Sequence, residues 1–277
     1  MALGKRKEKE QELFIATSQL LRTQAHPFYQ KLNEVFQQCG FDPFVEELCE
    51  PYYAKKGRPG IPPGIYFRMV LIGYFEGLDS QRGIAWRCND SLCLREFLGL
   101  AVTEPAPVHA SMTIIRQRLP ETVFDEVFVF VLKQLREHGL VKGKTVGVDA
   151  TTLEANAAMK SLQRRADQKN WQEYLRELAQ AKGIEYPTNE DLQGLDRGRK
   201  KKVSNKHWES CTDPDSRIGR MKDGRMHMTY KAEHSVDLET EAILSSHVTL
   251  GDRGDTKTGP ESVTLTQVNL NELEGDL

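Results

Sequence analysis

The residue best placed to do chemistry is Asp149, in the stretch Lys-Thr-Val-Gly-Val-Asp-Ala-Thr-Thr-Leu-Glu-Ala-Asn at positions 144–156. Val146 and Val148 alternate with small or polar residues, which predicts a short buried strand that ends at Asp149. A carboxylate beside an apolar strand is costly unless it is hydrogen-bonded, paired or bound to a cation. Two interpretations follow: Asp149 caps the next turn, or it is a metal ligand held at the edge of a sheet.

Basic residues form the second group with chemical potential. Six Lys or Arg occupy the twelve positions from 196 to 207, among them Arg199, Lys200, Lys201 and Lys202. Such a run is either a solvated loop or a surface that contacts phosphates. Nearer the amino terminus, the candidates for contacts with a DNA backbone or with bases are Arg82, Arg87, Arg116 and Arg118.

The stretch before Asp149 has the periodicity of helices. Two amphipathic helices with a break at His26-Pro27 are predicted over residues 9–38, and a Gly- and Pro-rich loop over 40–64. Helices with cap signals follow at 65–76, 81–87 (capped by Asp79 or Ser80), 92–98 (capped by Asp90 or Ser91), 112–119 (capped by Ser111) and 121–138 (closed by Gly139). The short, tightly turned helices among them fit a helix-turn-helix type of DNA-binding bundle.

After Asp149 the pattern becomes mixed. It predicts a helix over 155–182, a charged linker or insertion over 183–220, and a β-hairpin made of 226–237 and 242–250. A last helix is predicted at 261–270. The fold class is therefore α+β, with a helical domain at 1–140 and a second domain at 141–277.

Composition limits the class of protein. The 277 residues carry a net charge of −2 and 39% hydrophobic residues, and no apolar run approaches the roughly 18 residues of a membrane span. The charged amino terminus lacks the apolar core of a signal peptide, so we expect a cytoplasmic protein without a membrane partner. Five cysteines without a CxxC spacing argue against a disulfide scaffold.

Several motifs follow one another in a recognisable order and spacing. They are Val70-Leu-Ile-Gly-Tyr-Phe-Glu-Gly-Leu78 with Ser80-Gln-Arg82, Phe97-Leu-Gly-Leu100, the stretch from His109 to Leu119, Val148-Asp-Ala-Thr-Thr-Leu-Glu-Ala-Asn156, Thr212-Asp-Pro-Asp215, Gly224-Arg225, Tyr230-Lys-Ala-Glu-His-Ser-Val-Asp237 and Gly254-Asp-Thr256. Together they resemble the bacterial insertion-sequence transposases of the DDE type, and the likeness covers nearly the whole chain.

The resemblance implies a helical DNA-binding domain followed by a ribonuclease-H-like catalytic core. In that family three acidic residues hold two divalent cations, normally Mg²⁺, which activate a water or a DNA 3′-hydroxyl and stabilise the leaving oxygen. Hard cations prefer carboxylate oxygens, and a metal pair can clamp both ends of a phosphoryl displacement. Asp149 matches the first acid. The implied partner is double-stranded DNA, both terminal repeats and target, and a homodimer is a candidate assembly.

The chain also departs from the family pattern. The second Asp, in an Ala-Asp-Lys-Gly-Tyr-like motif, and the later Glu have no match before Leu277, and Asp252 and Asp255 align better with the loop before the family's helix. The core is therefore expected to be incomplete, in a truncated or frameshift-split transposase. Three interpretations remain: a transposase chain completed by a longer product, a non-catalytic DNA-binding remnant or regulator, and a remnant whose open sheet cannot fold.

Overall fold

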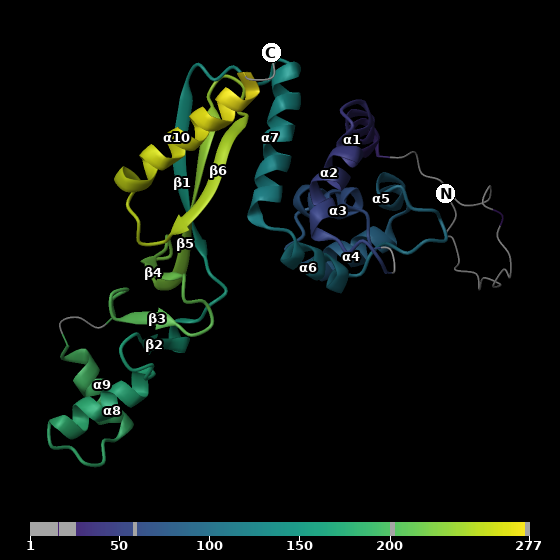
Figure 1. Cartoon of the computed structure of the whole chain (residues 1–277). Coiled ribbons are helices and arrows are strands. Elements are labelled where there is room, and N and C mark those ends of the chain that lie inside the picture. Colours follow the sequence, from purple (N-terminus) through teal and green to yellow (C-terminus); the bar gives the residue numbers. More distant parts are fainter. Residues whose placement is uncertain (1–15, 17–25, 58–59, 200–202, 275–277) are drawn as a thin grey trace, which may run out of the picture. The chain divides into compact units, whose positions relative to one another are not determined.

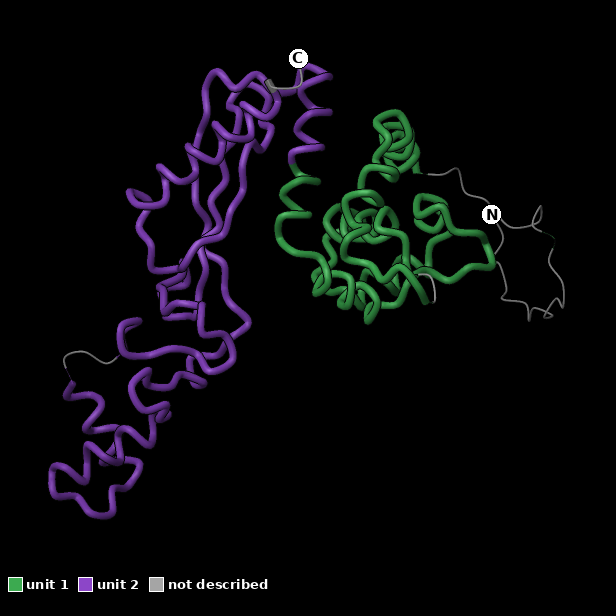
Figure 2. The backbone as a smooth tube through the Cα atoms, viewed as in Figure 1, with its two compact units in different colours: residues 1–128 green, residues 129–277 purple. Residues whose placement is uncertain are grey.

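The computed structural model describes residues 16, 26–57, 60–199 and 203–274, and the chain forms two compact units (Figures 1 and 2). Unit 1 comprises residues 1–128 and unit 2 residues 129–277. The division falls inside helix α7 (Glu121–Glu137), which the sequence predicts as a helix ending at Gly139. Within the described residues unit 1 is helical and all strands lie in unit 2, so the α+β class is confirmed.

Most helices of unit 1 lie close to the predicted ranges. They are α1 (Pro27–Gln38), α2 (Phe41–Cys49) with the short 3-10 helix η2 (Glu50–Tyr52), α3 (Pro63–Phe75), α4 (Gln81–Asp90), α5 (Leu92–Phe97), α6 (His109–Arg118) and the first part of α7. Ser80 and Ser91 cap α4 and α5, because each hydroxyl accepts a hydrogen bond from a backbone N–H three residues on. The helix predicted before His26 lies outside the described residues.

Two predictions in unit 1 are wrong. The loop predicted over 40–64 contains α2, because its Gly and Pro serve a helix start. Gly40 has φ 66° just before the helix, and Pro43 sits in the first turn, where no backbone N–H is needed. Helix α6 begins at His109, so Ser111 lies inside the helix and does not cap it.

A buried arginine joins four helices of unit 1. Arg68 on α3 is only 7% exposed, and its guanidinium forms a two-pronged ion pair with Asp42 of α2, in which Nη2 and Oδ2 are 2.9 Å apart. Its Nε donates to Oδ1 of Asn33 on α1 at 3.3 Å, and its guanidinium carbon lies 5.0 Å from the ring centre of Phe36 and 5.8 Å from that of Phe97 on α5. The charge is thus satisfied on all sides, which a buried charge requires.

Unit 2 is built on an antiparallel sheet. Strand β5 (Met226–Asp237) is central: β1 (Val146–Glu154) pairs with one of its edges, and β4 (Arg217–Arg220) and β6 (Ile243–Leu250) share the other. The predicted hairpin is confirmed as β5 and β6. Helix α10 (Asp255–Glu274) packs on one face of the sheet (Figure 1). No strand of the described residues pairs with the outer edge of β1.

The segment between β1 and β5 forms a small lobe, here called the insertion lobe (residues 155–210). It contains η3 (Met159–Ser161), β2 (Leu162–Arg164), α8 (Trp171–Ala181), α9 (Asn189–Arg197) and β3 (Trp208–Ser210). The helix predicted from 155 therefore begins only at Trp171, and the predicted linker contains α9, β3 and β4. Helix α9 escaped prediction because its buried face is narrow: Leu192 packs on Leu175 and Ala179 of α8.

Candidate active site and DNA interface

Asp149 is the fourth of the nine residues of β1, and not the last as predicted. The strand continues to Glu154, so no turn follows Asp149 and the turn-cap interpretation is wrong. Its side chain is exposed, and Oδ1 accepts a hydrogen bond from the N–H of Ala150 at 2.8 Å. The strand was also expected to be buried, yet its residues are half-buried or exposed.

The two faces of the sheet differ in character. Asp149 lies opposite His234 of β5, which lies opposite Ser246 of β6, so these three side chains share one face. The other face carries Glu233 and Ser245, which bond to side chains of α10. The carboxylate of Asp149 is therefore on the face that α10 does not cover.

His234 is the nearest candidate partner of Asp149, and it was not among the predicted site residues. Directly opposed residues of antiparallel strands have Cβ atoms about 4.5–5.5 Å apart. The Nδ1 atom of His234 is buried and has no hydrogen-bond partner among the residues that the structure describes. A neutral imidazole is a common metal ligand, so Asp149 and His234 form a two-residue candidate site. Within the described residues no group of three or more such ligands occurs.

The two acids near the start of α10 contact other residues of unit 2. Asp255 forms an ion pair with Lys231 at 2.5 Å, on the face covered by α10. Asp252 accepts a hydrogen bond from the side-chain amide of Asn205 at 3.2 Å, which ties it to the insertion lobe. Both residues therefore lie in contacts that hold unit 2 together.

Asp237, the last residue of β5, has a structural role. Its Oδ2 accepts hydrogen bonds from the backbone N–H groups of Lys142 at 2.7 Å and Gly143 at 2.8 Å, and Oδ1 accepts one from Glu239 at 2.9 Å. These backbone donors, led by Gly143, outweigh burial and lower the pKa of Asp237 to about 2. The carboxylate thereby fixes the loop that enters β1 and with it the position of Asp149.

A buried ionic cluster anchors α10 to β5. Glu233 is 2% exposed, and its carboxylate accepts hydrogen bonds from the hydroxyls of Thr258 and Ser262 and forms an ion pair with Lys231 at 2.6 Å. Burial raises the pKa of Glu233, but the bonds from Lys231, Ser262 and Thr258 prevail and bring it to about 2. These contacts attach β5, the strand that pairs with β1, to α10.

At the far end of β1, His227 bridges two carboxylates. Its Nδ1 lies 2.7 Å from Oε1 of Glu154, and its Nε2 lies 2.9 Å from Oδ2 of Asp223. The bonds to Asp223 and then to Glu154 raise the pKa of His227 above its ordinary value. The protonated imidazole therefore links the end of β1 to the turn between β4 and β5 by two ion pairs.

Replacing His227 by glutamine should destabilise unit 2 in a pH-dependent way. Because the folded-state pKa is raised, the contribution of His227 is fully present below its ordinary pKa of about 6.5 and is lost as pH rises through the folded-state pKa. Urea unfolding at pH 5.5 and pH 9 should show a deficit at the lower pH only. His138→Gln, which removes another exposed imidazole of unit 2, is the control. An equal deficit at both pH values would contradict the assignment.

The four candidate arginines of unit 1 fall into two pairs. Arg87 is engaged inside the unit, since its Nε lies 2.6 Å from Oε2 of Glu76. Arg118 stacks on Tyr53, with the guanidinium carbon 4.5 Å from the ring centre. Both side chains are therefore committed in part to internal contacts.

Arg82 and Arg116 have exposed side chains, and neither forms an ion pair with an acidic residue of the described chain. Gln81, next to Arg82 on α4, accepts a hydrogen bond from the hydroxyl of Thr113 on α6 at 2.5 Å. Arg116 follows Thr113 by three residues, about one helical turn. Both arginines therefore lie within about one helical turn of a contact between α4 and α6, and exposed cations on neighbouring helices are suited to contacts with phosphates.

The basic run is only partly described. Arg199 stacks on Trp171 and Tyr174, with its guanidinium carbon 4.9 Å and 5.0 Å from their ring centres, and lies 3.6 Å from Asp196. Lys200, Lys201 and Lys202 lie outside the described residues. DNA contact by this run stays a prediction.

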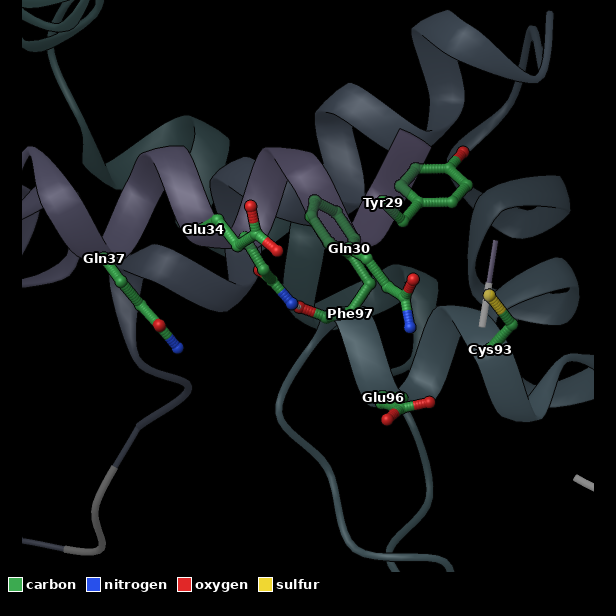
Figure 3. A pocket seen from close by; sticks show the side chains of 8 residues that line it. Tyr29, Gln30, Glu34, Gln37, Cys93, Glu96 and Phe97 are labelled. Carbon is green, nitrogen blue, oxygen red and sulfur yellow. Dashed lines mark hydrogen bonds between the residues drawn. The ribbon is translucent and has the colours of Figure 1, made fainter. Parts of the chain in front are cut away.

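Unit 1 also contains a cavity of about 320 Å³ between α1 and α5 (Figure 3). Glu34 and Glu96 contribute carboxylates to its lining, and Gln30 and Gln37 contribute amides. No lysine or arginine lines it in the described structure. Because carboxylates repel phosphates, this cavity does not favour binding to the DNA backbone.

Comparison with known proteins adds one finding. Residues 17–118 match the family model described as Transposase domain (DUF772), a span that includes α1–α6. No curated protein and no solved structure shows a significant match to the chain. Among the helices that the structure describes, none has the length and apolar character needed to cross a bilayer. The amino-terminal segment of this chain is therefore similar to a transposase domain.

Proposed function

We propose that this chain acts in DNA transposition. Unit 1 binds duplex DNA of an insertion-sequence end, and unit 2 contributes Asp149 as the first metal-ligating carboxylate of a ribonuclease-H-like core. The match of residues 17–118 to a transposase domain carries this proposal. The exposed Arg82 and Arg116 on α4 and α6 of that segment support duplex DNA as its partner.

Features of unit 2 agree with the proposed core. Asp149 projects from β1 on a face that α10 leaves open, and the hairpin and helix follow β1 in the order that the resemblance implies. An exposed carboxylate suits Mg²⁺, which prefers oxygen ligands and supplies charge stabilisation to phosphoryl transfer when bound. Asp149 and His234 alone do not complete such a site, since the described residues hold no group of three ligands.

A second candidate function is the regulation of transposition. A chain that binds DNA without a complete metal site would occupy the ends of the element and regulate transposition without cutting. The two functions agree on DNA binding by unit 1 and differ in catalysis. A cleavage assay separates them.

Replacing Arg82 and Arg116 by glutamine should weaken duplex binding and flatten its salt dependence. Each phosphate neutralised contributes about 0.9 to the slope of log affinity against log salt, so the double variant should lose about 2 from the slope. Fluorescence anisotropy of a labelled duplex that carries the element's end, at several salt concentrations, measures it.

Lys31→Gln is the matched control, because Lys31 is exposed on α1 and paired with Glu34 at 2.9 Å. It should leave the slope unchanged. If the double variant kept the wild-type slope, α4 and α6 would not form the DNA interface, and unit 1 would need a different binding surface.

A further inference from the structure

The insertion lobe contains a basic and aromatic pocket that the proposed function does not use. Its volume is about 430 Å³, within the range of small-ligand pockets. The lining includes the basic residues Arg164, Arg199, Lys206 and His207 and the aromatic residues Tyr174 and Trp208. No acidic side chain is among the described residues that line it.

Stacking fixes two of the cationic groups. The guanidinium carbon of Arg164 lies 4.5 Å from the ring centre of Tyr174, and that of Arg199 lies 5.0 Å from the same centre. A stacked guanidinium uses its planar face and keeps its N–H donors at the edge. Arg164 also contacts the carboxylate of Asp167 at 3.2 Å, which does not use all five donors of its guanidinium.

A hydrogen-bonded turn holds the opposite wall. The carbonyl of Ser204 accepts from the N–H groups of His207 at 2.9 Å and Trp208 at 3.0 Å, and the hydroxyl of Ser204 accepts from the N–H of Lys206 at 3.2 Å. Trp208 is only 4% exposed and anchors this turn in the core of the lobe. The turn therefore presents Lys206 and His207 beside a fixed aromatic wall.

We propose that this pocket binds a nucleotide. The guanidinium edge of Arg164 and the ammonium group of Lys206 bind its phosphate, and the base stacks on the aromatic and guanidinium planes. Cationic side chains interleaved with aromatic rings are the combination that recognises unpaired nucleotides. The nucleotide comes either from an unpaired DNA strand or from free solution. The pocket does not include Asp149, so nucleotide binding there can be tested independently of catalysis.

The tryptophans of the lobe provide a local readout. The chain has three tryptophans, and Trp86→Phe removes the one in unit 1. Trp171 and Trp208, with ring centres 4.9 Å apart, then report on the pocket. The full-length Trp86→Phe protein is titrated with thymidine monophosphate, a short oligothymidylate and a duplex, and tryptophan emission is followed.

Saturable quenching by the monophosphate or the oligothymidylate is expected, and the tighter ligand identifies the source. Lys206→Gln should weaken it roughly tenfold, the effect of losing one charge-assisted phosphate contact. Arg164→Gln, which shortens a stacked side chain, should act in the same direction. Arg176→Gln, an exposed arginine of α8 outside the pocket, should change the affinity by less than about twofold.

Three results would overturn the proposal. One is unchanged emission with all three ligands. Another is quenching by the duplex alone, since its bases are not free to stack in a pocket. The third is quenching that Lys206→Gln and Arg164→Gln leave as strong as in the Trp86→Phe protein.

Discussion

Replacing Glu233 by alanine is expected to lower the free energy of unfolding of unit 2 by about 3–5 kcal/mol. The substitution leaves Lys231, itself 7% exposed, as a buried charge whose remaining partners are Asp255 and the Thr258 hydroxyl. It also removes the acceptor of the Thr258 and Ser262 hydroxyls, which attach α10 to β5. Urea unfolding followed by tryptophan emission in the Trp86→Phe protein measures the change, because both remaining tryptophans lie in unit 2.

Two further variants show whether the cause is the unpaired charge. Glu154→Ala removes a carboxylate of the same sheet whose side chain is 57% exposed, and should cost less than about 1 kcal/mol. Lys231→Met combined with Glu233→Leu removes both charges and should recover most of the lost stability. A Glu233→Ala variant as mild as Glu154→Ala would contradict the role of the cluster.

The same cluster should also affect the stability of unit 2 at low pH. Because the pKa of Glu233 is lowered to about 2, its contribution is fully present above its ordinary pKa of about 4.5. It is lost as pH falls through about 2. Wild-type stability should therefore drop further over this range than that of Glu233→Ala.

The chain alone is expected to bind duplex DNA without cutting it. Each Mg²⁺ ion prefers near-octahedral oxygen coordination and gives up water reluctantly, so Asp149 with one imidazole cannot position two ions. Without a fixed pair, little stabilises charge on the attacking and leaving oxygens. The assay incubates labelled DNA carrying the element's ends with the protein and Mg²⁺ or Mn²⁺, and resolves the products on a denaturing gel.

Asp149→Ala is the control for this assay. Metal-dependent cleavage that disappears in the control would show that other groups of the chain complete the site, and His234→Ala would then test the nearest of them. If both proteins bind DNA and neither cuts it, the regulatory function is favoured over catalysis.

Local signals predicted the parts of the fold that local chemistry determines. Ser80 and Ser91 indicated the starts of α4 and α5, because a capping side chain bonds only to the first turn of its own helix. The alternation of apolar and polar residues in 226–250 predicted the hairpin. Helix α9 was missed since its stability depends on Leu192 meeting α8. Its nine residues carry a cap at Thr188 and one apolar face, but the high charge of the segment favoured the prediction of a linker.

The candidate site shows the same limit. Asp149 could be singled out because a carboxylate in an apolar strand is unusual on its own. His234 could not, since it reaches Asp149 only through the pairing register of β1 and β5. The stacking of Arg164 and Arg199 on the ring of Tyr174 could not be predicted either. It depends on the contact between α8 and β2 and on the path of the chain after α9.

The insertion lobe has a consequence for how the chain folds. β1 and β5 are neighbours in space, yet residues 155–225 separate them in sequence. The entropy cost of closing a loop grows only with the logarithm of its length, and a lobe that has already folded on its own small core shortens the effective loop further. Where β1 leads into the lobe, the N–H of Ala155 donates to the carbonyl of Met228 in β5 at 2.8 Å, so the two strands are already paired at the point where the lobe begins. Refolding should therefore be limited by the β1–β5 pairing, which brings together the most distant segments of the sheet.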